Sequence, residues 1–173
     1  NRGVFKEKGL EEIPINGPLP WSVPGCVDGW EMLRKRFGTL PFKKLLADPI
    51  RYAEEGFPVS EIIGRSWAGA ERALAKWPDS ARTYLPGGQA PRIGQMFTNP
   101  DLAWSYQQIA RDGAKGYYKG KIAERIVAFS EANGGYFSLK DFADHEGEWV
   151  DPVSTNYRGY DVWELPPNGQ GIA

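Results

Sequence analysis

The sequence has little of the two residues that most often build metal and nucleophile sites. It contains one cysteine, Cys26, and one histidine, His145, among 173 residues. A single cysteine excludes an internal disulfide, and this pair alone excludes a structural zinc cluster of the usual kind. The 21 basic and 22 acidic residues nearly cancel, so the charge gives no reason to expect nucleic acid as a partner. No apolar run approaches the length of a membrane span.

What the chain does have is helical periodicity, interrupted by proline and glycine. Apolar residues at intervals of three and four, with capping residues and glycine stops, predict a series of short helices. The expected helices cover residues 27–37, 41–55 with a break near 47–48 caused by Pro49, 60–77, 100–112, 121–133 and 138–143. The last begins with a capping box, Ser138 to Asp141.

The remaining segments give the chain its expected organisation. Residues 1–25 are rich in proline and glycine and predict loops with strand fragments, and 78–97 predict a long surface loop inside a helical region at 26–145. Residues 146–173 predict a small β element, with strands at 148–153 and 157–165, followed by the start of a helix. The chain is therefore expected to be mainly α with a small β element.

The chain contains seven tryptophans. They could form a platform that binds a ligand, or they could belong to the hydrophobic core. Trp67 and Trp77 share one stripe of the expected 60–77 helix with other apolar residues, so we expect both in the core. A binding module that uses tryptophans stays open as the alternative.

Few residues suggest chemistry of their own. His145 lies between Asp144 and Glu146, an arrangement that could bind a metal or transfer protons, but we interpret it as an exposed residue at a helix end. Cys26 and His145 could form a nucleophilic pair, although Cys26 at a helix start is expected to be a small buried residue. Acidic neighbours such as Glu54 and Glu55 point in different directions and do not form a glycosidase dyad.

The C-terminal residues suggest a piece of a longer protein. Two prolines, Pro166 and Pro167, stop the last expected strand, and the chain ends on what resembles the first turn of a helix. An isolated two-stranded hairpin is marginal in water, so we expect its strands to join a sheet built by residues outside this chain. An exposed apolar surface is then expected where the rest of the protein docks.

Three groups of motifs in order resemble the large subunit of γ-glutamyltransferases. The first is Ser-Val-Pro-Gly-Cys-Val-Asp-Gly-Trp at 22–30, Phe-Gly-Thr-Leu-Pro at 37–41 and Pro-Ile-Arg-Tyr-Ala-Glu-Glu-Gly-Phe at 49–57. The second is Asn-Pro-Asp-Leu-Ala at 99–103, Ile-Ala-Arg-Asp-Gly at 109–113 and Tyr-Tyr-Lys-Gly-Lys-Ile-Ala at 117–123. The third is Gly-Gly at 134–135, Asp-Phe-Ala at 141–143, Tyr-Arg-Gly-Tyr at 157–160 and Pro-Pro at 166–167. Each motif is weak alone, but the ordered set covers nearly the whole chain.

This resemblance implies an N-terminal nucleophile hydrolase with an αββα sandwich and a precursor that cleaves itself into two subunits. The new N-terminal threonine of the small subunit would be the nucleophile, and γ-glutamyl or other amides would be substrates. The implied partners are the rest of the large subunit and the small subunit, with no cofactor and no metal. Family members are commonly exported, so the resemblance implies a periplasmic or extracellular location.

The resemblance places no catalytic residue in this chain. None of the four threonines precedes a histidine, and the arginine segment that the family uses for the glutamyl α-carboxylate would precede residue 1. The turn after the strand also departs from the Pro-Pro-Pro-Ser-Ser-Gly-Gly of transferases, because Asn168 stands before Gly169 and Gln170 stands between Gly169 and Gly171. This departure resembles the acylase-like branch. Asn168 and Gln170 are weak candidates for substrate contacts, with capping of the next helix as the alternative. A non-catalytic interaction module of the same fold also stays open.

Overall fold

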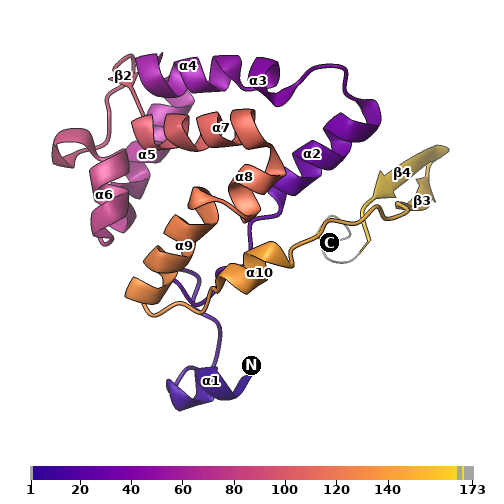
Figure 1. Ribbon diagram of the computed structural model, residues 1–173. Helices are drawn as coiled ribbons and strands as arrows, with labels where there is room; N and C mark the ends of the chain where they lie inside the picture. The colour runs from indigo at the N-terminus through magenta and orange to yellow at the C-terminus, as the bar shows by residue number, and fades with distance from the viewer. Residues whose placement is uncertain (1, 167–168, 170–173) are drawn as a thin grey trace.

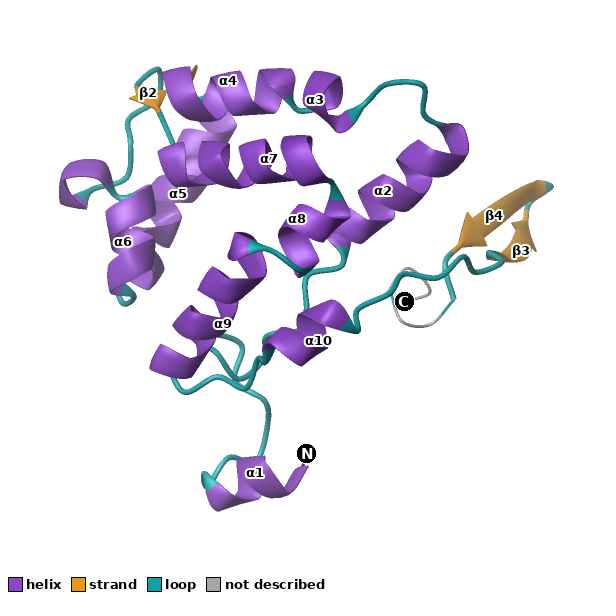
Figure 2. Cartoon of the chain, in the orientation of Figure 1, coloured by secondary structure: helices purple, strands orange, loops and turns teal. Residues whose placement is uncertain are grey.

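A computed structural model describes residues 2–166 and 169 of the chain as a series of short helices with two small two-stranded sheets (Figures 1 and 2). The elements in order are α1 (Arg2–Glu7), α2 (Cys26–Phe37), α3 (Phe42–Leu45), α4 (Ala47–Glu55), β1 (Phe57–Pro58), α5 (Glu61–Leu74), α6 (Pro78–Tyr84), a 3-10 turn (Pro86–Gly88), β2 (Met96–Phe97), α7 (Pro100–Asp112), α8 (Ala114–Tyr118), α9 (Lys121–Ala132), α10 (Leu139–Ala143), β3 (Val153–Tyr157) and β4 (Tyr160–Glu164). None of the helices described is long and apolar enough to cross a bilayer.

The core lies where α2, α3 and α7 to α10 meet, as the arrangement in Figure 1 shows. Phe142 of α10 is fully buried, and Ile109 of α7 and Ala123 of α9 are almost as inaccessible. Short turns at Gly113 and at 119–120 keep α7, α8 and α9 in contact along the chain. The mainly α character that the sequence predicts is confirmed.

Local signals placed most helices correctly. Asn99 caps α7, since its side-chain oxygen accepts a 3.0 Å hydrogen bond from the Leu102 amide. The capping box from Ser138 to Asp141 forms at α10 as expected. The 41–55 stretch breaks at Leu46, one residue before the expected point, and Pro49 then lies in the first turn of α4, where its missing N–H costs nothing.

Three segments differ from the prediction. Residues 2–7 form α1 and not a strand fragment, although 8–25 are loop as expected. The 78–97 stretch is not a plain surface loop. Pro78 at the first position starts α6, and β2 pairs antiparallel with β1, with Phe57 opposite Phe97. Leu85 and Phe97 are buried, so this excursion folds over a small apolar cluster of its own. Helix α8 was not predicted, because five residues are too few to show a period.

The stripe on α5 is not a core face in this structure. Trp77 is 42% exposed and Ile63 is 50% exposed, so the prediction that Trp77 belongs to the core is wrong. Trp67 is half-buried; its indole N–H donates to the Tyr84 carbonyl oxygen at 2.8 Å, and its ring meets that of Phe97 edge-on at 4.7 Å. The period correctly identified an apolar face, of which Trp67, Ala70 and Leu74 are half-buried and Ile63 and Trp77 are exposed.

Strands β3 and β4 form an antiparallel hairpin near the end of the chain, at the right of Figure 2. The tight turn places Arg158 at φ 52° and Gly159 at φ 87°, as a two-residue turn of type I′ requires. The strand expected at 148–153 is wrong except for Val153, where β3 begins. β4 lies within the expected 157–165, but Arg158 and Gly159 of that range form the turn. All five residues of β3 are exposed, as are four of the five in β4.

Candidate functional site

The segment that leads to the terminal hairpin is anchored on the N-terminus of α2. We call residues 144–151, which join α10 to β3, the strap. The Asp28 carboxylate in the first turn of α2 accepts a 2.6 Å hydrogen bond from the Gly147 amide of the strap. This charge-assisted contact fixes the direction in which the chain leaves the helical region.

Tyr118 of α8 also binds the N-terminal end of α2. Its hydroxyl donates to the Pro24 carbonyl oxygen at 2.6 Å and accepts from the Asp28 amide at 3.2 Å. Burial raises the pKa of the Tyr118 phenol to about 12, and the nearby Tyr117, Asp28 and Cys26 add to the increase, although the hydrogen bond from Asp28 opposes it. The neutral phenol therefore acts as a structural tie and not as a proton carrier near neutral pH.

His145 of the strap packs against this tie. Its ring stacks on Tyr118, with 4.9 Å between ring centres and 23° between planes. It is half-buried, and its Nε2 atom is buried without a hydrogen-bond partner in the structure, so the expectation of a simply exposed residue is wrong. The ring also lies against Gly25, where an added Cβ would come within 3.3 Å of Cε1.

The Cys26–His145 pair receives no support from the geometry. Cys26 is exposed and not buried as expected, because it occupies the outer side of the first turn of α2 while Val27 faces the core. No hydrogen bond joins the Cys26 thiol to His145 among the described residues. Nor does any group of three or more histidine, cysteine, aspartate or glutamate residues form a possible metal site in the described part of the chain.

Glu31, one turn further along α2, holds the start of α8. Its carboxylate accepts a 2.6 Å hydrogen bond from the Ala114 amide and pairs with Lys35 at 3.0 Å. Burial by itself raises the pKa of Glu31, but the hydrogen bonds from Ala114 and Lys35 and the charge of Arg34 outweigh it, so this pKa lies below its ordinary value of 4.5. Asp28 and Glu31 thus fix two different segments to one helix.

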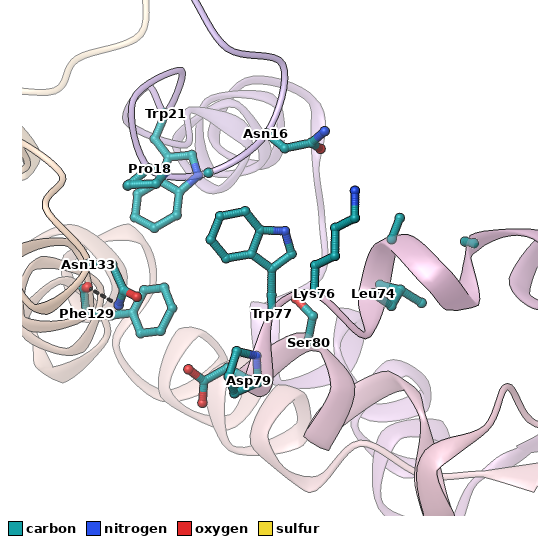
Figure 3. Close-up of a pocket in the computed structure, with 14 residues that line it drawn as sticks. Asn16, Pro18, Trp21, Leu74, Lys76, Trp77, Asp79, Ser80, Phe129 and Asn133 are labelled. Atoms are coloured by element: carbon teal, nitrogen blue, oxygen red, sulfur yellow. Dashed lines mark hydrogen bonds between the residues drawn. The ribbon is translucent and has the colours of Figure 1, made fainter. Parts of the chain in front are cut away.

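The tryptophan platform left open by the sequence corresponds in part to an aromatic pocket of about 490 Å³ (Figure 3). Trp21 stacks on Phe129 at 5.8 Å on one side, and Trp77 lies on the other. Asn133 also lines the pocket, and its amide nitrogen bonds the Phe129 carbonyl oxygen at 2.8 Å. The pocket can accept an apolar group, but its lining contains neither histidine nor cysteine.

The candidate substrate residues Asn168 and Gln170 lie outside the described residues. The residues that the structure does bring together, Asp28, Tyr118 and Gly147, were not singled out by the sequence. Their hydrogen bonds join positions 90 and 119 residues apart, and no local period or motif encodes a contact of that range.

Comparison with known proteins identifies the family. The gamma-glutamyltranspeptidase family model matches residues 1–173. A glutathione hydrolase-like proenzyme of Bacillus subtilis is 40% identical over 99% of this chain, and an oxamate amidohydrolase proenzyme of Klebsiella pneumoniae is 36% identical over 95%. The chain spans about a third of the length of these relatives, 32% of each.

Solved structures of the same family also match this chain. The cephalosporin acylase of Bacillus halodurans superposes with a TM-score of 0.92 at 40% identity, over 99% of this chain and 33% of the acylase chain. The γ-glutamyltranspeptidase of Helicobacter pylori gives a TM-score of 0.87 at 31% identity, over 94% of this chain and 47% of that one. A model match along the whole chain, supported by these structures, shows that the chain belongs to the γ-glutamyltranspeptidase family, whose matched relatives include acylases as well as glutathione hydrolases.

Proposed function

We propose that this chain is part of the large subunit of a self-processing amidohydrolase or acyltransferase. The observation that carries the proposal is the family match along residues 1–173, with relatives named as proenzymes. In the proposed mechanism a threonine, freed as the N-terminus of a second subunit, attacks the carbonyl carbon of an amide. Its own α-amino group takes the hydroxyl proton and passes it to the amide nitrogen, so that the C–N bond breaks, the neutral amine leaves and an acyl-enzyme forms. Water or an acceptor amine then takes the acyl group.

In this proposal the nucleophile lies outside the 173 residues, and the chain supplies part of its support. The strands β3 and β4 would join the sheets of an αββα sandwich, since a hairpin exposed on both faces needs neighbours. The helical region at 26–145 would form an outer layer. The contacts of Asp28 and Tyr118 would then fix the hairpin, and the chain that follows it, relative to that layer.

The substrate that we propose depends on whether the protein belongs to the glutathione hydrolases or to the acylases of this family. A γ-glutamyl amide of the glutathione type is the first candidate, because glutathione hydrolases are among the relatives. An acylase acting on other amides is the second, and one observation favours it. Asn168 and Gln170 depart from the transferase turn. Identity does not separate the two candidates, since it is 40% both to the cephalosporin acylase and to the glutathione hydrolase-like proenzyme of Bacillus subtilis. We retain Asn168 and Gln170 as weak candidates for substrate contacts.

The decisive experiment uses the full-length precursor. Expression of the gene beyond Ala173 is expected to give a protein that cleaves itself into two subunits, seen as two bands that replacement of the new N-terminal threonine by alanine prevents. The mature protein should hydrolyse γ-glutamyl-p-nitroanilide or, for an acylase, an acylated cephalosporin in preference. A precursor that never cleaves and hydrolyses neither would support the non-catalytic module. The isolated 173 residues are expected to be inactive on both substrates, because they contain no candidate nucleophile.

A further inference from the structure

Three aromatic rings from distant parts of the chain line the pocket of Figure 3. Trp21 lies in the loop before α2, Trp77 directly precedes α6, and Phe129 lies in α9. We call these three residues the aromatic triad. The pocket volume of about 490 Å³ is in the range of small-molecule sites. Two of the tryptophans that the sequence left without a role therefore belong to a space of ligand size.

The rings of the triad keep part of their surface free. Trp21 is 37% exposed, Phe129 is 41% exposed and Trp77 is 42% exposed. Trp77 is nevertheless held in place, because its Cη2 atom lies 3.3 Å from the position that a Cβ on Gly17 would take. Aromatic rings carry negative charge density on their faces and attract cations. The triad is therefore a fixed aromatic surface on which a cation can bind.

Asn133 places an oxygen beside the triad. It follows the last residue of α9 and lines the pocket. Its amide nitrogen donates to the Phe129 carbonyl oxygen at 2.8 Å, so the direction of the amide is set. The amide oxygen points towards Trp77 in Figure 3 and accepts no hydrogen bond from the residues that the structure describes. This partial negative charge is available to a ligand.

Asp79 adds a full negative charge. Its side chain lines the pocket from the first turn of α6, and 60% of it is exposed. Arg82 approaches it only to 3.8 Å, whereas the same guanidinium lies 3.2 Å from Asp101. Arg82 is therefore paired more closely with Asp101, and the Asp79 carboxylate stays available to a second cation.

The positions of the charges favour a cation over an anion. Lys76 is the only basic residue in the described lining of the pocket. In Figure 3 it extends on one side of Trp77, while the Asp79 carboxylate points to the other side, where Phe129 lies. The space between Trp77 and Phe129 thus combines aromatic rings with two oxygen acceptors, and Lys76 points away from it.

We propose that the aromatic triad, with Asp79 and Asn133, forms a binding site for an organic ammonium ion. The charged nitrogen and the apolar groups on it lie among the three rings, and the two oxygens balance the charge. Such cages of aromatic side chains bind quaternary ammonium ligands in other proteins. The proposal goes beyond the proposed amide chemistry and rests on none of its steps.

Calorimetric titration of the full-length protein with choline tests the proposal. The nitrogen of choline carries no hydrogen and cannot accept an acyl group, so binding through it is separate from turnover. The control is 3,3-dimethylbutan-1-ol, which has the same shape without the charge. We expect choline to bind at least about tenfold more tightly. Equal affinities would show a merely apolar pocket and overturn the proposal. Absence of choline binding would overturn it too, because the site would then be covered or unsuited to a cation.

Two matched carboxylates locate the charge. Asp79→Asn should weaken choline binding by about fivefold. Asp101→Asn removes the other carboxylate near Arg82 but does not line the pocket, so it should change nothing. Lys76→Gln should leave choline binding unchanged or strengthen it. Equal effects of the two aspartate variants, or loss of binding in Lys76→Gln, would overturn the proposed site.

Substitution of Trp77 tests the ring. Trp77→Leu should weaken choline binding by about tenfold and leave the neutral alcohol almost unaffected, whereas Trp77→Phe keeps a ring and should retain most of the affinity for choline. Urea unfolding of each variant shows that the fold is intact. Unchanged choline binding in folded Trp77→Leu would overturn the proposal. If the leucine variant unfolds, the phenylalanine and Asp79 variants still decide it. All readouts measure binding, so they are independent of whether the protein hydrolyses amides.

Discussion

The Asp28 carboxylate and the Gly147 amide are 119 residues apart in sequence and 2.6 Å apart in the structure. This contact closes the helical region around α2 and determines where the strap begins its path to the hairpin. The side chain that accepts it lies in the first turn of α2, where a negative charge is also favoured by the helix dipole. An added Cβ at position 147 would lie 2.7 Å from Met32 Sδ and 2.8 Å from Asp28 Oδ2, so both of these side chains would have to move.

Asp28→Ala is expected to release the strap. A hydrogen bond to a charged acceptor contributes about 1.5–3 kcal/mol, which corresponds to roughly ten- to a hundredfold faster exchange of the Gly147 amide. Hydrogen exchange read by mass spectrometry on peptides from 144–151 measures this. Asp48→Ala, which removes only an exposed ion pair with Arg51, is the control and should not change exchange in the strap.

Gly147→Ala should destabilise the protein by about 1–3 kcal/mol, since the new methyl group overpacks the corner between Met32 and Asp28. The matched control is Gly69→Ala in α5, where an added Cβ meets nothing within 4 Å. That change should stabilise the helix by about 0.5–1 kcal/mol. Urea unfolding measures both. Equal effects of the two substitutions would contradict the close approach at Gly147.

Alkaline pH should weaken the tie at Tyr118. The folded state keeps the phenol neutral up to a pKa of about 12, whereas the unfolded chain ionises near 10. The stabilisation is therefore complete below pH 10 and is lost as pH rises from 10 to 12. Unfolding free energies across this range should fall less steeply in Tyr118→Phe than in the wild type. An identical slope in both proteins would show that the phenol is not held neutral.

Acid should weaken the contact at Glu31. Its folded-state pKa lies below 4.5, so its contribution is present above pH 4.5 and is lost as pH falls through the folded value. Glu31→Gln should lower stability at pH 7 and leave a shallower acid limb in a plot of unfolding free energy against pH. Glu61→Gln, which removes an exposed pair with Arg65, should cost at most about 1 kcal/mol at pH 7.

The hairpin turn can be improved. Arg158 has a positive φ of 52°, a conformation that costs most residues roughly 1–2 kcal/mol and asparagine less. Arg158→Asn should therefore stabilise the hairpin by about 0.5–1 kcal/mol, since Asn-Gly is the preferred pair for this turn. Nuclear magnetic resonance of a peptide covering 152–165 would report the folded fraction. Arg158→Lys is the control, and a gain as large as that of asparagine would refute the backbone explanation.

The parts of the fold that could be predicted from the sequence depend on residues that are close together in the chain. The caps at Asn99 and Ser138 and the stop at Gly113 act within three or four residues, and each was visible in the sequence. The exposed apolar surface was also expected, and Phe37 at 68% exposure confirms it. The errors at Trp77 and Cys26 have one cause. Trp77 was assigned to the core from an apolar stripe and Cys26 from its place at a helix start, and neither signal shows what packs against the side chain.

The sequence by itself determined where most helices begin and end, and it contains the ordered motifs that indicate the family. Those properties depend on neighbours a few residues apart. Only the tertiary structure decided that Asp28, Tyr118 and Gly147 meet, and that Leu33 and Phe37 of α2 are exposed while Val27 is buried. Burial and long-range hydrogen bonds depend on elements brought together by the whole fold, and no short stretch of sequence contains that information.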